Sequence, residues 1–172
     1  MLVVGPSGAG KDTLMEAARA ALRGDPHTLF ATREITRHAE AGGEAHVEVS
    51  VKTFMARRDT GYYALHWGAH GLFYGIPRSI DAALAAGRVV VANVSRSVLA
   101  EAAVRYRVRV LLITAPMEVL AARLLARGRE SAEDVAARLR REVVVPEGLE
   151  TVRVVNDRSV AEGVAAVVGA LR

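Results

Sequence analysis

Buried strands and amphipathic helices alternate along most of this chain. Four short runs rich in Val, Leu and Ile each precede a segment in which apolar residues recur with helical spacing. Runs of this kind are typical of strands buried on both faces of a parallel sheet, and their alternation with helices indicates βαβ units. The expected strands are residues 2–4, 88–94, 108–115 and 151–157, and the expected helices begin near residues 10, 95, 116, 131 and 159.

The middle of the chain departs from this pattern. Residues 31–50 are irregular, with weak strand character toward their end, and a short helix is expected over 50–58. Residues 61–77 concentrate glycine and aromatic residues and are expected to form a glycine-rich loop. Pro77 then opens a helix that Gly87 closes, because proline suits the first helical position and glycine suits the position after the last.

Capping signals mark the start of the last two helices. Ser131 with Asp134, and Ser159 with Glu162, have the three-residue spacing of a capping box. No linker, repeat or low-complexity segment interrupts the chain. The pattern therefore predicts an α/β fold in one domain over residues 1–172, a parallel β-sheet with helices on both faces.

The composition is that of a soluble domain. Hydrophobic residues make up 51% of the chain and charged residues 24%, which argues against disorder. No apolar run approaches the roughly 20 residues that span a bilayer. The N-terminus leads almost directly into a glycine-rich segment, which leaves no room for a signal peptide. We therefore expect a cytoplasmic protein without a membrane partner.

Charge and cysteine content narrow the chemistry. The chain has no cysteine, which excludes disulfides, thiolate metal sites and a cysteine nucleophile. The net charge is +4, but the basic residues are scattered among acidic ones. Anionic small substrates explain this excess better than a nucleic acid does. The sequence leaves the oligomeric state open, with a homodimer among the alternatives.

The strongest signal is a phosphate-binding loop of the form G-x-x-x-x-G-K-[ST], directly between a predicted strand and a predicted helix. Its glycines let backbone N–H groups point at phosphates, and the helix start adds its positive end. Lys11 supplies a mobile cation for the β- and γ-phosphates of ATP, and is a candidate catalytic residue. The candidate nucleotide-binding residues here are Gly5, Pro6, Ser7, Gly8, Ala9, Gly10, Lys11, Asp12 and Thr13.

Asp12 stands where this loop usually has a hydroxyl residue. That hydroxyl normally ligates Mg²⁺, and a carboxylate at the end of another strand helps to hold the ion. Here the corresponding strand ends with Asn93. One hypothesis is that Asp12 holds Mg²⁺ or its waters, with Asn93 as a neutral neighbour. The alternative is that Asp12 caps the helix and the Thr13 hydroxyl meets the metal.

Further motifs resemble a known family. GPSGAGK, YG after the aromatic-rich segment, RLLARGRESAEDVAARL and VVND occur in guanylate-kinase-like order along nearly the whole chain. GPSGAGKD, the R-x-I-T-R of residues 33–37 and the W-x-A-H-G-L-x-Y-G-I-P of residues 67–77 are similar to the ribose 1,5-bisphosphate phosphokinases of phosphonate catabolism. The resemblance implies a P-loop NTPase fold with a core of about 1–30 and 76–172, a substrate-binding insertion of about 31–75 and a helical lid of about 123–142.

The same resemblance implies ATP-dependent phosphorylation of ribose 1,5-bisphosphate to 5-phospho-α-D-ribose 1-diphosphate. The alternatives are a guanylate or other nucleoside monophosphate kinase, a sugar-hydroxyl kinase, and a non-catalytic guanylate-kinase-like interaction module. Glu40, His46 and Gly68 stand where guanylate kinases carry groups that grip the nucleotide phosphate or read the base. These departures favour a small-molecule sugar phosphate without a base.

Four residues are expected to bind this substrate. Arg33 and Arg37 lie four residues apart, and two forked guanidinium groups suit a doubly phosphorylated sugar. His70 and Tyr74 bracket Gly71 and offer hydrogen bonds to phosphate or ribose oxygens. The alternatives are scattered loop arginines and ordinary structural side chains.

Three further residues are assigned to the nucleotide side of the reaction. Closure of the lid over about 123–142 would bring Arg127 and Arg138 to the transferring phosphoryl group as candidate catalytic residues. An ordinary solvated arginine face is the alternative. Asn156 follows the last strand, where such folds place a loop near the adenine, and it either binds adenine or secures the turn.

Overall fold

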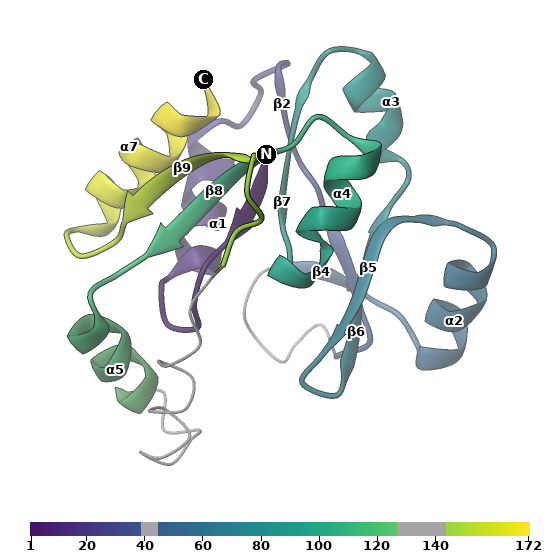
Figure 1. Cartoon of the computed structure of the whole chain (residues 1–172), viewed down its shortest axis with the longest axis horizontal. Helices are drawn as coiled ribbons and strands as arrows, with labels where there is room; N and C mark the ends of the chain where they lie inside the picture. The colour runs from purple at the N-terminus through teal and green to yellow at the C-terminus, as the bar shows by residue number, and fades with distance from the viewer. Residues whose placement is uncertain (39–44, 127–143) are drawn as a thin grey trace.

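The computed structural model describes residues 1–38, 45–126 and 144–172 of the chain. Its centre is a parallel sheet of five strands in the order β2-β7-β1-β8-β9 (Figure 1). The neighbouring pairs in this sheet are all parallel, as the buried apolar runs predict. The strands are β1 (Leu2–Val4), β2 (Thr28–Phe30), β7 (Val89–Asn93), β8 (Arg109–Thr114) and β9 (Glu150–Val155). Of these, β2 is absent from the sequence-based expectation.

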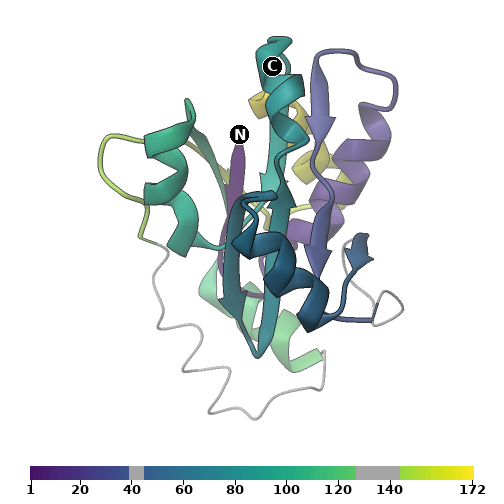
Figure 2. The ribbon, with the colours of Figure 1, turned by 90° about the vertical axis from the view of Figure 1, so that its right-hand side faces the viewer.

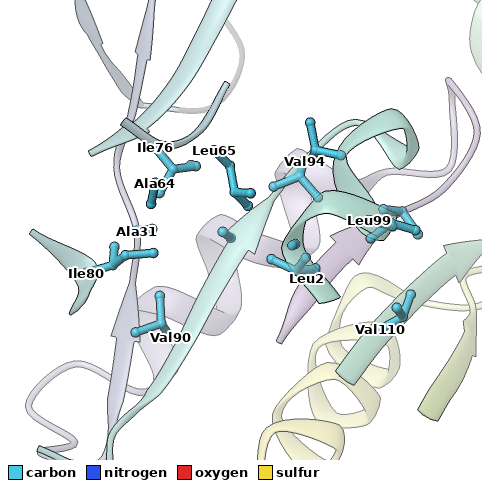
Figure 3. Close-up of a cluster of buried hydrophobic side chains, with 14 of the residues drawn as sticks. Leu2, Ala31, Ala64, Leu65, Ile76, Ile80, Val90, Val94, Leu99 and Val110 are labelled. Carbon is cyan, nitrogen blue, oxygen red and sulfur yellow. The ribbon is translucent and has the colours of Figure 1, made fainter. Parts of the chain in front are cut away.

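Alternate residues of each central strand face opposite layers of the molecule. Val3 and Leu111 pack with α1 (Lys11–Ala21) and α7 (Val160–Leu171) on one face. Leu2 and Val110 pack on the other face with α3 (Ile80–Ala85), α4 (Leu99–Arg105) and the second sheet, as Figure 3 shows in part. The predicted sheet flanked by helices on both faces is therefore confirmed.

Helix boundaries mostly agree with the expected ones. The Ser159 side chain accepts a bond from the Glu162 N–H, and the Glu162 carboxylate accepts one from the Ser159 N–H, so the predicted capping box is present. A 3-10 turn (Arg96–Val98) precedes α4, and α5 (Met117–Ala126) follows β8. The expected helix from residue 131 lies outside the described residues. Among the helices of the described ranges, none is long and apolar enough to cross a membrane.

Described residues between 33 and 77 form a second sheet, and Figure 2 shows this part of the molecule facing the viewer. Its strand order is β4-β3-β6-β5, and α2 (Val51–Asp59) packs against it with Phe54 buried against Tyr63. The strands are β3 (Arg33–Ile35), β4 (His46–Glu48), β5 (Tyr63–Ala69) and β6 (Leu72–Pro77). This sheet overlaps the substrate-binding insertion expected over about 31–75.

Three expectations for this region are wrong. Arg33–Ile35, at the start of the stretch expected to be irregular, form β3. The glycine-aromatic segment is not a loop but a β-hairpin, because its residues pair across two strands, Trp67 with Tyr74 and Gly68 with Phe73. Pro77 does not open a helix; it ends β6, and α3 begins at Ile80. A strand end tolerates proline because no further ladder N–H is needed from it.

Candidate active site

A cleft of about 550 Å³ lies where the carboxyl ends of β1 and β7 face the second sheet. Ligands of open α/β sheets bind outside the carboxyl ends of the strands, so the cleft is where this fold offers a site. It brings together predicted residues from both halves of the site: Gly5, Pro6, Ser7, Lys11 and Asp12 on one wall, and Arg33, Arg37, His70 and Tyr74 on the other.

The phosphate loop connects β1 to α1 and depends on its glycines. A Cβ at Gly5 would overlap the backbone carbonyl oxygen of Ile113 in β8, so no larger residue fits there. Gly10 has φ 81°, in the left-handed region, and directly precedes α1. The loop therefore brings backbone N–H groups and the positive end of an 11-residue helix to the cleft, the arrangement that binds phosphates.

Lys11 lies folded over this loop. Its Nζ donates to the carbonyl oxygens of Gly5 at 2.8 Å and Pro6 at 2.9 Å. The ammonium group is thus held at the mouth of the cradle by neutral acceptors. Bonds to phosphate oxygens are charge-assisted and stronger, so a bound polyanion would compete for this group.

Asp12 and Asn93 are in contact, as the first of the two hypotheses for Asp12 supposes. Asn93 Nδ2 donates to Asp12 Oδ1 at 3.0 Å, and Asn93 is buried while Asp12 is exposed at the cleft. Thr13 is also exposed but is not among the residues that line the cleft. The α1 N-cap is Gly10, which has no side-chain cap.

These residues fit one magnesium ion beside bound phosphates. Mg²⁺ takes oxygen ligands and is usually held by one or two carboxylates together with substrate phosphates and water. The Asp12 carboxylate provides such a ligand. In the described part of the chain, no group of three or more His, Cys, Asp or Glu residues could hold a metal. An ion here would accordingly depend on the nucleotide for most of its ligands.

Asn156 supports the phosphate loop from behind. It is buried, and its Nδ2 donates to the carbonyl oxygen of Ala9 at 2.8 Å. A Cβ on Gly10 would come within 2.5 Å of the same nitrogen. The amide therefore secures the phosphate loop, a role that differs from both alternatives considered for it, adenine binding and securing its own turn. Direct contact with adenine stays a prediction.

The opposite wall is built on a stack of side chains. The rings of Trp67 and Tyr74 are parallel within 2°, with centroids 5.4 Å apart, and they come from paired positions of β5 and β6. The guanidinium carbon of Arg33, on β3, lies 5.7 Å from the centroid of the Tyr74 ring. The stack fixes where Arg33 presents its charge to the cleft.

His70 reaches the cleft from the tip of the hairpin. It and Gly71 form a two-residue turn between Ala69 and Leu72, with φ 53° and 74°. Two consecutive positive φ angles are the requirement of a type I′ turn, which matches the twist of a hairpin. Asn is the usual residue at that first position, so His70 holds an uncommon backbone conformation at the rim of the site.

A buried carboxylate anchors the strand that carries Arg33. Glu34 points to the other face of β3, where its Oε2 accepts bonds from Arg57 Nη1 and the Tyr63 hydroxyl, both at 2.6 Å. Its Oε1 accepts from the Tyr62 hydroxyl at 3.2 Å. Burial, together with the hydrogen bond and charge of Glu34, raises the pKa of Tyr63, so this phenol stays protonated.

Sequence reasoning missed Glu34 and Arg96. Arg96 lines the cleft from the segment after β7. Its position directly beyond a strand end is the signal that could have found it. Glu34 offers no comparable signal, because its partners are 23 to 29 positions away in the chain. Arg127 and Arg138 lie outside the described residues.

Comparison with known proteins places the chain in a family. No family model matches it. The ribose 1,5-bisphosphate phosphokinase PhnN of Brucella melitensis is 52% identical over 147 residues, which cover 85% of this chain and 77% of that protein. The protein of the same name from Rhizobium etli is 51% identical over 142 residues, or 82% of this chain and 72% of that protein.

Two further comparisons extend this result. A bifunctional ribose 1,5-bisphosphokinase-thymidine phosphorylase of Azorhizobium caulinodans is 50% identical over 171 residues; they cover 98% of this chain, but this chain spans only 25% of that protein. The crystal structure of guanylate kinase from Anaplasma phagocytophilum matches with a TM-score of 0.70 at 20% identity, covering 100% of this chain and 84% of that one, so the fold is guanylate-kinase-like. With relatives about half identical along most of their own length, this chain belongs to the ribose 1,5-bisphosphate phosphokinase family.

Proposed function

We propose that this chain transfers the γ-phosphoryl group of ATP to the 1-phosphate of ribose 1,5-bisphosphate. An oxygen of that phosphate forms a bond to the γ-phosphorus. The bond from the γ-phosphorus to the β–γ bridging oxygen breaks, and its electron pair leaves with ADP. The products are 5-phospho-α-D-ribose 1-diphosphate and ADP.

The observation that carries the proposal is the make-up of the cleft. One wall is a phosphate loop with Lys11 and Asp12, and the facing wall presents Arg33 and Arg37. Two polyanions that meet in one cleft need positive charge on both walls, one set of cations for each polyanion. Phosphoryl transfer depends on alignment and charge neutralisation more than on covalent help from the protein. The names of the relatives supply the identity of the acceptor.

A phosphate acceptor also explains why the cleft needs no general base. The second pKa of a phosphate is about 6, so its oxygens are already ionised at neutral pH. A sugar hydroxyl would have to lose a proton to a nearby carboxylate. At the end of β7 the residue is the neutral Asn93, whose amide is bonded to Asp12.

Each residue near the transferring group has a physical role. Lys11 exchanges its carbonyl partners for phosphate oxygens, and Asn93 orients the Asp12 carboxylate. Asp12 would hold Mg²⁺, which when bound neutralises charge on the β- and γ-phosphates. Arg127 and Arg138 stay predicted stabilisers of the transferring group.

The stacked wall favours a sugar phosphate over a nucleotide as acceptor. One face of the Tyr74 ring lies against Trp67, and Arg33 lies over Tyr74 as well. Trp67 is 8% exposed, so its own ring offers little surface. A nucleobase gains much of its binding from stacking on an aromatic face. In this wall the rings of Trp67 and Tyr74 position the guanidinium group of Arg33 and do not form a stacking surface for a base.

The test is a coupled assay of ADP release with Mg²⁺ and one acceptor at a time. We expect turnover with ribose 1,5-bisphosphate and at least 100-fold lower kcat/KM with GMP. Arg33→Ala should raise the KM for the sugar by about 10–100-fold and leave the KM for ATP unchanged, because one charge-assisted contact is lost. Arg107→Ala removes an exposed arginine outside the cleft and serves as the matched control. Turnover with GMP alone would make the chain a guanylate kinase.

A further inference from the structure

Arg96 is a third guanidinium group among the described residues that line the cleft, beside Arg33 and Arg37. We propose that Arg96 binds the phosphate of the acceptor that is not attacked, and so makes the site selective for a doubly phosphorylated sugar. The inference rests on the proposed function, because it concerns the acceptor of that reaction.

The charge of the cleft calls for a second phosphate on the acceptor. Among the described residues, the lining holds four cationic side chains, Lys11, Arg33, Arg37 and Arg96, and one carboxylate, Asp12. Lys11 is bonded to the phosphate loop itself, so we assign it to the nucleotide. The other three cations are arginines. A sugar with two phosphates carries about three to four negative charges at pH 7, and three forked cations match this better than they match a single phosphate.

The course of the chain places Arg96 away from the point of transfer. Asn93 is tied to Asp12 beside the phosphate loop, and the N–H of Val94 donates to the carbonyl oxygen of Val3 at 3.0 Å. After this bond to β1 the chain that continues from β7 turns away, and Arg96 follows two residues after Val94 as the start of the 3-10 turn. A backbone advances about 3.3–3.6 Å per residue when extended, so Arg96 begins up to roughly 10 Å beyond the Asn93 contact.

The attacked phosphate, in contrast, must lie close to the phosphate loop. It must lie in line with the γ-phosphate, next to Lys11 and the loop. An arginine further along the cleft is suited to the other end of the sugar. Arg96 comes from the parallel-sheet side, whereas Arg33 comes from β3 of the second sheet, so the two groups approach an acceptor from different walls.

Binding measurements with half-substrates separate this role from others. Ribose 5-phosphate carries only the phosphate that is not attacked, and ribose 1-phosphate carries only the attacked one. Isothermal titration calorimetry should show that Arg96→Ala raises the dissociation constant of ribose 5-phosphate by about 10–100-fold, the usual loss for one charge-assisted contact. The dissociation constant of ribose 1-phosphate should change less than twofold. Arg96→Lys should fall between, since it keeps the charge but loses the fork.

Arg107→Ala is the control, because it removes the same charge from an exposed position outside the cleft. A loss for ribose 1-phosphate alone would place Arg96 at the attacked phosphate and overturn the proposal. Equal losses for both half-substrates, or no loss for either, would overturn it as well. Turnover is measured separately with the wild-type chain and ribose 1,5-bisphosphate. Absence of turnover would contradict the proposed function, whereas the pattern of dissociation constants decides the role of Arg96.

Discussion

The two walls of the cleft recognise their ligands by different means. The phosphate loop presents backbone N–H groups and a single lysine, and its shape is fixed by contacts that leave no room for a side chain at Gly5 or Gly10. The second sheet presents side chains, and these are held by other side chains, Arg33 by Tyr74 and Tyr74 by Trp67. Backbone recognition suits the phosphates common to all nucleotides, whereas side-chain recognition can be adapted to one acceptor.

This difference implies that the walls can be damaged separately. Changes in the phosphate loop should affect the transfer step whatever the acceptor. Changes in the second sheet should weaken binding of the acceptor and leave binding of the nucleotide unchanged. Single substitutions on each wall test that separation.

The largest effect is expected from Lys11→Ala. Loss of the cation that meets the transferring phosphates should lower kcat by about 10²–10³, as does loss of a comparable preorganised donor in other enzymes. The fold should be unaffected, because the bonds of Lys11 run to carbonyls of its own loop. The control is Lys52→Ala, the other lysine of the chain, which is exposed on α2. A loss smaller than tenfold in steady-state assays would contradict this assignment.

The buried carboxylate of Glu34 should contribute to the free energy of unfolding. Glu34→Gln keeps the shape but removes the charge that Arg57 and Tyr63 bond, and should cost about 2–3 kcal/mol in the free energy of unfolding. Glu101→Gln is a matched control, because Glu101 pairs with Arg105 where both are exposed, and should cost under about 0.5 kcal/mol. Urea titration measures both. Equal effects would show that the burial of Glu34 has no energetic consequence.

A smaller effect is expected at the tip of the hairpin. Asn suits the first position of a type I′ turn better than His does, so His70→Asn should keep or slightly raise the melting temperature. If the imidazole contacts the acceptor, the KM for the sugar should rise about fivefold to tenfold, as for a neutral hydrogen bond, and the KM for ATP should not change. An unchanged acceptor KM would remove His70 from the site.

The smallest effect expected is the pH dependence that comes from ionisation of Tyr63. Because the pKa of Tyr63 is raised in the folded chain, its ionisation opposes folding. Its contribution to stability is complete below the pKa of an unfolded tyrosine, about 10, and is lost as the pH rises through the higher folded value. The tyrosinate absorbance that develops near pH 10 in the native protein should therefore be the same in the wild type and in Tyr63→Phe, because Tyr63 does not ionise there. A normal midpoint for Tyr63 would show that the phenol does not donate to Glu34.

The sequence predicts the two walls to different degrees for a physical reason. The phosphate loop, the long buried strands and the capping box at Ser159 depend on neighbours in the chain, and the structure has all of them. The second sheet depends on three-residue strands such as β3, whose partners are distant, so its pairing carries no local signal. Arg33 and Tyr74 could be named as candidates, but not the stack that positions them.

The central claim is that this cleft phosphorylates a sugar bisphosphate and not a nucleotide. The most direct measurement is a ³¹P NMR competition in which limiting ATP and Mg²⁺ are given with equal amounts of ribose 1,5-bisphosphate and GMP. We predict the paired signals of a diphosphate on phosphoribose, with GMP unchanged. Formation of GDP while the sugar bisphosphate stays intact would contradict the account.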